Sequence, residues 1–248
     1  MAENAKRVAL IAGGSGDIGR AVSRKLAGNG LRVHIGYNHA AETAKAVAEE
    51  IRASGGHADA VHVDVLDSWN VNQVCEMIFN AEHRLDILVN CAAVNREAPA
   101  AGMDDDTWRE VLDVNLDGAF RLCRAAAKYM ILGRWGRIVN VSSISAEHGG
   151  RGQINYAVSK AGVEAMTRVL ALELGRKGVL VNCVAPGVIE TRMSGRVRSD
   201  HGDALLDTIA LRRFGTPGEV AELVSFLVSD AAGYVAGQVI RIDGGMML

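Results

Sequence analysis

Three polar side chains have the types and the spacing needed for proton transfer. Tyr156 and Lys160 are four residues apart, and Ser143 lies thirteen residues before the tyrosine. On a helix, the four-residue spacing puts the tyrosine and the lysine on one face. A lysine ammonium favours the phenolate, so such a tyrosine can exchange a proton with an alcohol or a ketone near neutral pH. The pair alone is more often ordinary helix-surface spacing, so the hypothesis needs a hydride carrier nearby.

The candidate serine stands at the end of an apolar run. Residues 137–141 predict a strand, and Ser143 follows its carboxyl end. From that position its hydroxyl could hold a substrate oxygen. Ser142 is the rival for this role.

The amino end of the sequence offers a place for the hydride carrier. The apolar run 7–12 is typical of a parallel strand covered on both faces, and the glycine-rich turn 13–19 follows it. A helical pattern over 17–28 comes next. Glycines let a backbone approach a pyrophosphate, and a helix N-terminus offers free N–H donors. Tight turns also use glycine for steric reasons alone, but the place between strand and helix favours a dinucleotide site.

Composition limits the function classes. The 248 residues, 49% of them hydrophobic, predict a single α/β domain over 1–248. A net charge of −2 gives no support for binding nucleic acid or a membrane surface. The first residues are polar and no apolar run is long enough to span a membrane, so we expect a cytoplasmic protein. The four scattered cysteines predict free thiols, and no metal site is expected.

Strand and helix patterns alternate along the chain. This order predicts a Rossmann fold, a doubly wound seven-stranded parallel sheet with helices on both faces. The expected strands are 7–12, 31–36, 58–63, 85–90, 136–142, 178–184 and 238–242. The expected helices are 17–28, 40–53, 68–83, 104–132, 153–176 and 217–229, of which 104–132 could be one bent helix or two.

Residues 188–214 interrupt this alternation. The segment is polar and charged, and it follows Pro186 and Gly187 at the end of a predicted strand. Ligands bind at the carboxyl ends of the strands in such sheets. We therefore interpret 188–214 as a substrate lid with short helices, and call it the lid.

Together these residues resemble the short-chain dehydrogenase/reductase family from about residue 6 to the C-terminus. Within the family the chain is most similar to the 3-oxoacyl-(acyl carrier protein) reductases. The matching pieces are Asp64-Val65, 88–93, Asn115, Ser143, Tyr156 to Lys160, 181–187 and 243–245.

The sequence departs from the family pattern at three places. Ala12 replaces a usual threonine, and Asn90-Cys-Ala-Ala93 stands where Asn-Asn-Ala-Gly is frequent. In the glycine turn, Asp17 occupies the place of the middle glycine and Gly16 precedes it. Asp17 is then either a helix N-terminal residue favoured by the helix dipole or an anion close to a phosphate.

The resemblance implies roles for four catalytic residues. Tyr156 is the general acid in reduction, and Ser143 rather than Ser142 orients the substrate carbonyl. Lys160 bonds the nicotinamide ribose and lowers the pKa of the tyrosine. Asn115 helps to hold a water that relays protons from Lys160; its alternative interpretation is a satisfied core asparagine.

The resemblance also implies a cofactor site. Asp64 would accept a hydrogen bond from the adenine amine beside Val65, and Asn90 would bond the ribose region or lock its turn. Pro186, Gly187 and Ile189 would cover the carboxamide end. The full set of expected cofactor-binding residues is Gly13, Ser15, Gly16, Ile18, Gly19, Asn38, His39, Asp64, Val65, Asn90, Ala92, Tyr156, Lys160, Pro186, Gly187, Ile189 and Thr191.

The end of the second predicted strand indicates which dinucleotide is used. Residues 35–39 contain no acidic side chain that would bond a ribose 2′-hydroxyl and repel a 2′-phosphate. Asn38 and His39 can donate to that phosphate. NADPH is therefore the expected cofactor.

The leading function is reduction of a 3-oxoacyl thioester on acyl carrier protein, in fatty-acid or polyketide-type synthesis. One alternative is an NAD(P)-dependent dehydrogenase of a small polyol, sugar or cyclic alcohol, and another is a non-catalytic dinucleotide-sensing scaffold. We expect a homotetramer, from apolar residues on 104–132 and 153–176. Arg134 and Lys177 are the candidate docking residues for the acidic carrier near the site mouth, with helix capping as the alternative.

Overall fold

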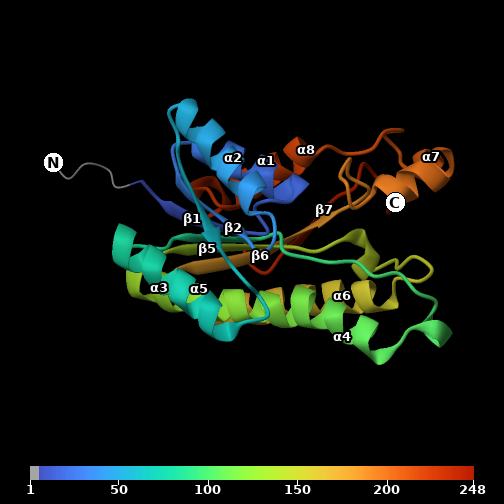
Figure 1. The fold of residues 1–248 in the computed structure, drawn as a ribbon, viewed down its shortest axis with the longest axis horizontal. Helices are drawn as coiled ribbons and strands as arrows, with labels where there is room; N and C mark the ends of the chain where they lie inside the picture. Colours follow the sequence, from blue (N-terminus) through green and yellow to red (C-terminus); the bar gives the residue numbers. More distant parts are fainter. Residues whose placement is uncertain (1–5) are drawn as a thin grey trace.

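The computed structural model describes residues 6–248, and its elements follow the predicted order. Seven parallel strands form one sheet in the order β3-β2-β1-β4-β5-β6-β7, which confirms the predicted Rossmann fold (Figure 1). The strands are β1 (Val8–Ala12), β2 (Arg32–Tyr37), β3 (His57–His62), β4 (Ile87–Asn90), β5 (Gly136–Val141), β6 (Val179–Pro186) and β7 (Val239–Ile242).

Helices cover both faces of the sheet (Figure 1). Alternate side chains of β1 enter different cores: Ile11 packs in the core under one helical layer and Leu10 in the core under the other. Burial on both faces explains the unbroken apolar run in this strand. One layer holds α1 (Asp17–Gly28), α2 (Ala41–Ala53) and α8 (Pro217–Leu227); the other holds α3 (Ser68–Glu82), α4 (Asp105–Leu112), α5 (Gly118–Gly133) and α6 (Ile154–Leu174).

The predicted long helix 104–132 is divided. A π-helical turn, Asp113–Asp117, separates α4 from α5 and contains Asn115. Such turns occur often at functional sites because they redirect a side chain out of the regular helical register. Here the turn aims the Asn115 amide at the loop that follows β4, where it binds the backbone of Val94.

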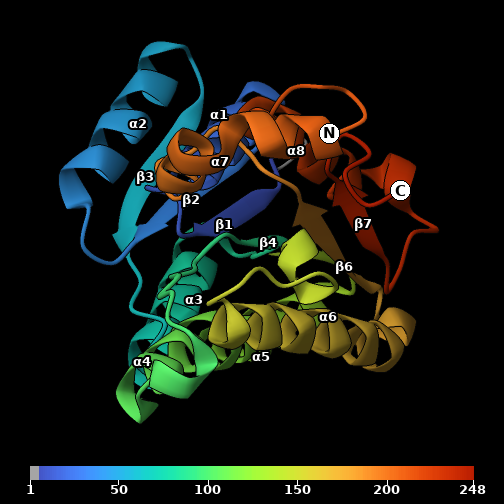
Figure 2. The ribbon, with the colours of Figure 1, turned by 90° about the vertical axis from the view of Figure 1, so that its right-hand side faces the viewer.

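The strand order reverses between β1 and β4, so the loops after these strands diverge and leave room for a ligand at the carboxyl edge of the sheet. The lid begins at this edge, directly after β6. It contains α7 (Gly195–Thr208), which is bent at His201. Figure 2 looks onto this edge and shows α7, in orange, in front of the layer that holds α1 and α8. Among residues 6–248, no helix is long and apolar enough to span a membrane.

Candidate active site

Tyr156 and Lys160 lie one turn apart near the start of α6. The Lys160 Nζ atom is 5.6 Å from the centroid of the tyrosine ring. It donates a 2.8 Å hydrogen bond to the carbonyl oxygen of Val141, the last residue of β5. The lysine is only 3% exposed, so its ammonium is enclosed by the protein. Strand β5 and helix α6 together fix this pair at the carboxyl edge of the sheet.

The pKa values of the two groups move in opposite directions. Burial lowers the pKa of Lys160 to about 8. Burial raises the pKa of Tyr156 to about 12, although a hydrogen bond with Ser143 opposes that rise. The expectation was that the lysine lowers the tyrosine pKa; in this structure the pKa lies above its ordinary value, because desolvation of the phenolate is the largest effect. Tyr156 therefore keeps its proton at neutral pH, as a proton donor must.

The two candidate serines point in different directions. Ser142 is buried, and its hydroxyl donates to the Glu164 carboxylate at 2.8 Å. The Ser143 hydroxyl accepts from the Ser145 backbone N–H at 3.1 Å and also lies in reach of Tyr156. Only Ser143 is therefore directed to the side of the tyrosine, as the thirteen-residue spacing indicated.

Asn115 joins two elements that flank the site. Its side-chain nitrogen donates to the Val94 carbonyl at 2.9 Å and to the Ser159 hydroxyl at 3.1 Å. Its side-chain oxygen accepts from the Val94 backbone N–H at 2.8 Å. Both amide hydrogens are used, so the side chain ties the loop after β4 to α6 beside Lys160. This agrees with a satisfied core asparagine that positions the site.

Asn155 has a similar positioning role that the sequence reasoning missed. It is fully buried, and its side-chain nitrogen donates to the Arg96 carbonyl at 3.0 Å. Its side-chain oxygen accepts from the Tyr156 backbone N–H at 2.7 Å. An asparagine directly before the tyrosine, on the buried side of a predicted helix, was the available signal.

The glycine turn packs tightly against the end of β4. Gly13 has a φ of +71°, and a Cβ there would lie 2.6 Å from the Ala92 backbone nitrogen. A Cβ on Gly19 would lie 2.3 Å from the Gly13 carbonyl oxygen. Gly16 is the N-cap of α1 and supplies no side-chain cap. The backbone N–H groups of the first turn, 17–19, thus lack a capping side chain, which suits a dinucleotide pyrophosphate. Ser15 and Ile18 belong to the same turn.

The polar residues expected at the adenosine end come together. The Asn38 side-chain nitrogen lies 3.4 Å from the Asp64 carboxylate, and His62 contacts the Asn38 side-chain oxygen at 3.3 Å. The Asp64 carboxylate also accepts from the Leu66 backbone N–H at 3.0 Å. His39 is exposed beside this group.

Val65, also expected at the adenine, is buried in the core. Its side chain packs closely against Gly118 of α5: a Cβ on that glycine would lie 2.9 Å from the Val65 side chain. The side chain is thus turned toward α5, which leaves the backbone of Val65 as the part beside the Asp64 group.

The segments at the carboxyl ends of β4 and β6 form the remaining side of the candidate cofactor site. The Asn90 side-chain oxygen accepts from the Ala92 backbone N–H at 3.2 Å, so it locks the turn. Cys91 donates its backbone N–H to the Ala12 carbonyl at 2.9 Å, so the turn tolerates the unusual Asn-Cys-Ala-Ala sequence. Pro186 ends β6, Gly187 and Ile189 follow it, and the Thr191 hydroxyl contacts that of Ser194 at 3.2 Å.

The candidate docking residues lie elsewhere. Arg134 directly follows α5, and Lys177 ends the short helical turn after α6; both are exposed. They precede β5 and β6, whereas Ser143 and Pro186 come at or after the carboxyl ends of the same strands. Within one subunit, the expectation that they lie near the site mouth is wrong, because the two edges are separated by the length of the strands.

Metal chemistry has no support in the described residues. No group of three or more histidine, cysteine or acidic side chains is placed to hold a metal ion in residues 6–248. Burial raises the pKa of each of the four cysteines to about 12, so these thiols are poor ligands and poor nucleophiles.

Comparison with known proteins agrees with this geometry. Residues 12–247 match a family model described as enoyl-(acyl carrier protein) reductase. The chain is 43% identical to the 3-oxoacyl-(acyl-carrier-protein) reductase FabG of Aquifex aeolicus, over 97% of each protein. It is 40% identical to the FabG of Thermotoga maritima, over 98% of each. A crystal structure provisionally described as a gluconate dehydrogenase from Agrobacterium tumefaciens superposes with a TM-score of 0.93 at 32% identity, covering 97% of this chain and 95% of the other.

Proposed function

Because the chain belongs to the short-chain dehydrogenase/reductase family and is an NAD(P)-dependent oxidoreductase, we propose that it reduces a 3-oxoacyl thioester on acyl carrier protein to the 3-hydroxyacyl thioester. The observation that carries this proposal is a protonated Tyr156 beside Ser143 and the buried Lys160, at the edge where the glycine turn lies. Similarity to the FabG reductases over almost the whole chain supports the substrate class.

Each polar residue has a defined part in the reduction. Ser143 donates a hydrogen bond to the substrate carbonyl oxygen and holds it beside the tyrosine. Tyr156 gives its proton to that oxygen as negative charge develops there. Lys160 binds the nicotinamide ribose and, as a cation next to the ring, stabilises the phenolate left after transfer. The bound nicotinamide supplies the hydride, and the protein supplies position and electrostatics.

NADPH is the proposed dinucleotide. The end of β2 has no acidic side chain, and Asn38 and His39 can donate to a 2′-phosphate. With no arginine at this place the preference is modest. Measurement of kcat/KM with each dinucleotide tests it, and a clear preference for NADH would contradict it.

The similarity to a protein provisionally described as a gluconate dehydrogenase favours a second candidate, oxidation of a small polyol or sugar acid. Oxidation of NADPH by acetoacetyl thioester, compared with a panel of sugars, polyols, gluconate and quinones, separates the two. Turnover of any of these excludes the dinucleotide-sensing scaffold. The lid is the proposed cover for the substrate in either case.

We also propose that the chain forms a homotetramer with two-fold axes. Of the residues that motivated this, Val163 and Leu174 are buried within the subunit, but Val158 and Val169 on α6 are 42% and 52% exposed. Phe120 on α5 is 47% exposed. Helices carrying such side chains gain by packing against another copy. Light scattering that showed a monomer at micromolar concentration would exclude the assembly.

Carrier docking would then involve a second subunit. Two copies packed antiparallel along α5 and α6 would bring Arg134 and Lys177 of one toward the site edge of the other. We expect that Arg134→Glu with Lys177→Glu raises KM for carrier-bound substrate, and more strongly at low salt, because exposed charges act mainly on association. Turnover of a free small thioester should barely change. Equal effects on both substrates, or none, would reject the docking residues.

A further inference from the structure

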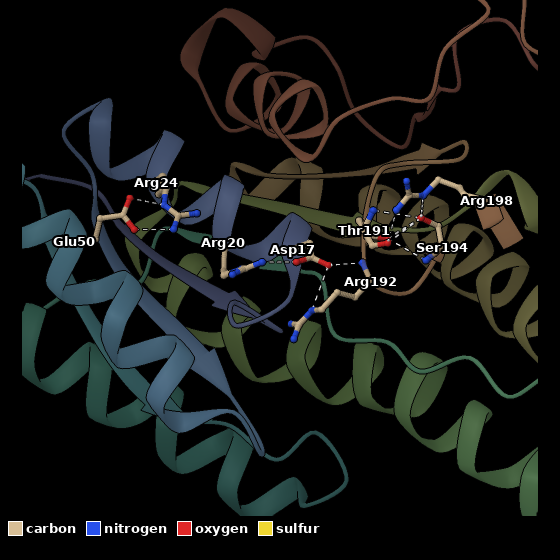
Figure 3. Close-up of polar contacts among 8 residues, drawn as sticks. All are labelled: Asp17, Arg20, Arg24, Glu50, Thr191, Arg192, Ser194 and Arg198. Atoms are coloured by element: carbon tan, nitrogen blue, oxygen red, sulfur yellow. Dashed lines mark hydrogen bonds and ion pairs between the residues drawn. The ribbon is translucent and has the colours of Figure 1, made fainter. Parts of the chain in front are cut away.

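Asp17 connects two parts of the molecule that are 175 residues apart. It is the first residue of α1 and lies within the glycine turn, and its side chain is 14% exposed. One carboxylate oxygen accepts from the Arg192 backbone N–H at 2.7 Å and lies 3.7 Å from the guanidinium of the same residue. The other oxygen binds the Arg20 guanidinium. Figure 3 shows the carboxylate between the two arginines.

These contacts keep the carboxylate charged. Burial alone would raise the pKa of Asp17, but the hydrogen bonds from Arg192 and Arg20, together with their charges, lower it below its ordinary value. A charged acceptor makes hydrogen bonds about twice as strong as neutral ones. The attachment therefore holds at any pH near neutrality.

The part of the lid that binds Asp17 is a folded unit, residues 188–194, which we call the lid tip. The Ser194 hydroxyl donates to the carbonyl oxygens of Ile189 and Thr191, and the Arg198 guanidinium donates to the Thr191 carbonyl at 3.2 Å. These internal bonds, drawn in part at the right of Figure 3, give the tip one shape.

The lid tip is attached at two places. At its base, Glu190 donates its backbone N–H to the Gly215 carbonyl at 2.8 Å, and Gly215 donates to the Val188 carbonyl at 3.0 Å. At its other end it is bound to Asp17. Loss of the Asp17 contacts would free that end while the base stayed paired, so the tip would swing away from the glycine turn without unfolding.

We propose that Asp17 is a positioning residue that latches the lid tip onto the glycine turn and thereby slows release of the dinucleotide. This inference rests on the proposed function in one respect: it takes the glycine turn as the binding site for NADPH. A dinucleotide pyrophosphate lies at such a turn. The lid tip is bound to Asp17 in this turn and so borders the path by which the dinucleotide leaves. The cofactor therefore leaves when the latch opens.

The first test is NADPH release, followed by the fluorescence of the bound nicotinamide in a stopped-flow displacement experiment. Asp17→Asn should release NADPH about tenfold faster, since it loses a charged acceptor shared by two hydrogen-bond donors, the Arg192 backbone N–H and the Arg20 guanidinium. Arg192→Gln keeps the backbone donor, so its effect should be smaller. Glu50→Gln is the matched control. It neutralises a carboxylate on α2 that is paired with Arg24, and Arg24 lies on the same helix as Asp17 but away from the lid. Equal release rates in Asp17→Asn and Glu50→Gln would overturn the proposal.

The second test needs no cofactor. Trypsin cleaves after arginine only where the backbone can leave its contacts, and Arg192 is held to Asp17 through its own backbone N–H. In the free protein, Asp17→Asn should be cleaved after Arg192 several-fold faster than the wild type or Glu50→Gln. Equal cleavage would show that no latch exists. A wild type that binds no dinucleotide would reject the proposed function and the release step, while unequal cleavage would still support the latch.

Discussion

The first half of α6 and the lid meet at the same edge of the sheet but are held in different ways. Near the start of α6, polar side chains are buried and have partners inside the protein, as Asn155, Ser159 and Lys160 do. In α7 of the lid, no residue is buried. The part that does the chemistry is therefore fixed by the core, whereas α7 is held by surface contacts and the lid enters the core only on either side of it, at Ile189 and Ile209.

The physical difference is the cost of breaking a contact. In a buried network an unpaired polar group has no water to replace its partner, so the network opens only with the core around it. On the surface water competes for each group, and local opening needs little free energy. Substitutions in the lid should thus leave the geometry at Tyr156 unchanged. The rates at which substrate and cofactor enter and leave should respond to them.

The largest effect is expected from removing the proton donor. Tyr156→Phe should lower kcat by about 10²–10⁴-fold, the usual contribution of a general acid. The phenol contributes little to holding the dinucleotide, so the dissociation constant for NADPH should stay close to that of the wild type. Steady-state kinetics and a fluorescence titration measure the two quantities. Activity within a few-fold of the wild type would reject the assignment of Tyr156.

Asn115→Ala tests whether the buried network fixes the site. It leaves both backbone groups of Val94 without their partner, so the free energy of unfolding should fall by about 2–4 kcal/mol. Urea unfolding measures this change. Asn29→Ala is the control, since Asn29 is exposed and, within residues 6–248, its side chain bonds only that of Ser225; it should change stability by less than about 0.5 kcal/mol. Similar losses in the two variants would contradict the difference between core and surface.

Lys160→Met should abolish activity and yet stabilise the free protein at pH 7 by about 1–2 kcal/mol, after the lost bond to Val141 is counted. The lysine pKa is about 8 in the folded protein and 10.5 in its ordinary state. Between these values the unfolded chain binds the proton and the folded chain does not, so wild-type stability rises with pH.

The advantage of Lys160→Met should therefore be full below pH 8 and shrink toward pH 10.5. Urea unfolding at pH 7 and pH 9.5 measures it, with the surface variant Lys25→Met as the control. An advantage that grew with pH would show that burial does not penalise the lysine charge.

The smallest effect on stability is expected in the lid. Ser194→Ala removes the hydroxyl that closes the lid tip, but the site is partly solvated, so the free energy of unfolding should change by less than about 0.5 kcal/mol. Amide hydrogen exchange over residues 189–198 should become faster while exchange in α6 stays the same. Faster exchange in α6 as well would mean that the two regions open together.

The order of elements could be predicted from the sequence because its signals are local. The apolar runs, the glycine turn and the helical periodicity placed every strand and most helix ends within two or three residues of their observed bounds. The same patterns placed Ser143 just after β5 and placed Tyr156 and Lys160 on α6. Each of these inferences needs only a strand or helix and its neighbours along the chain.

Other properties depended on which side chains the folded chain brings together. The contact between Asp17 and Arg192 joins distant residues, so no local pattern contains it. The pKa of Tyr156 rises rather than falls because burial, which only packing decides, outweighs the hydrogen bond with Ser143. Arg134 and Lys177 lie at the amino edge because strand direction decides which end of a strand a residue reaches. The sequence determined the elements and the reacting groups, and the tertiary structure decided their partners, their protonation and their distance from the site.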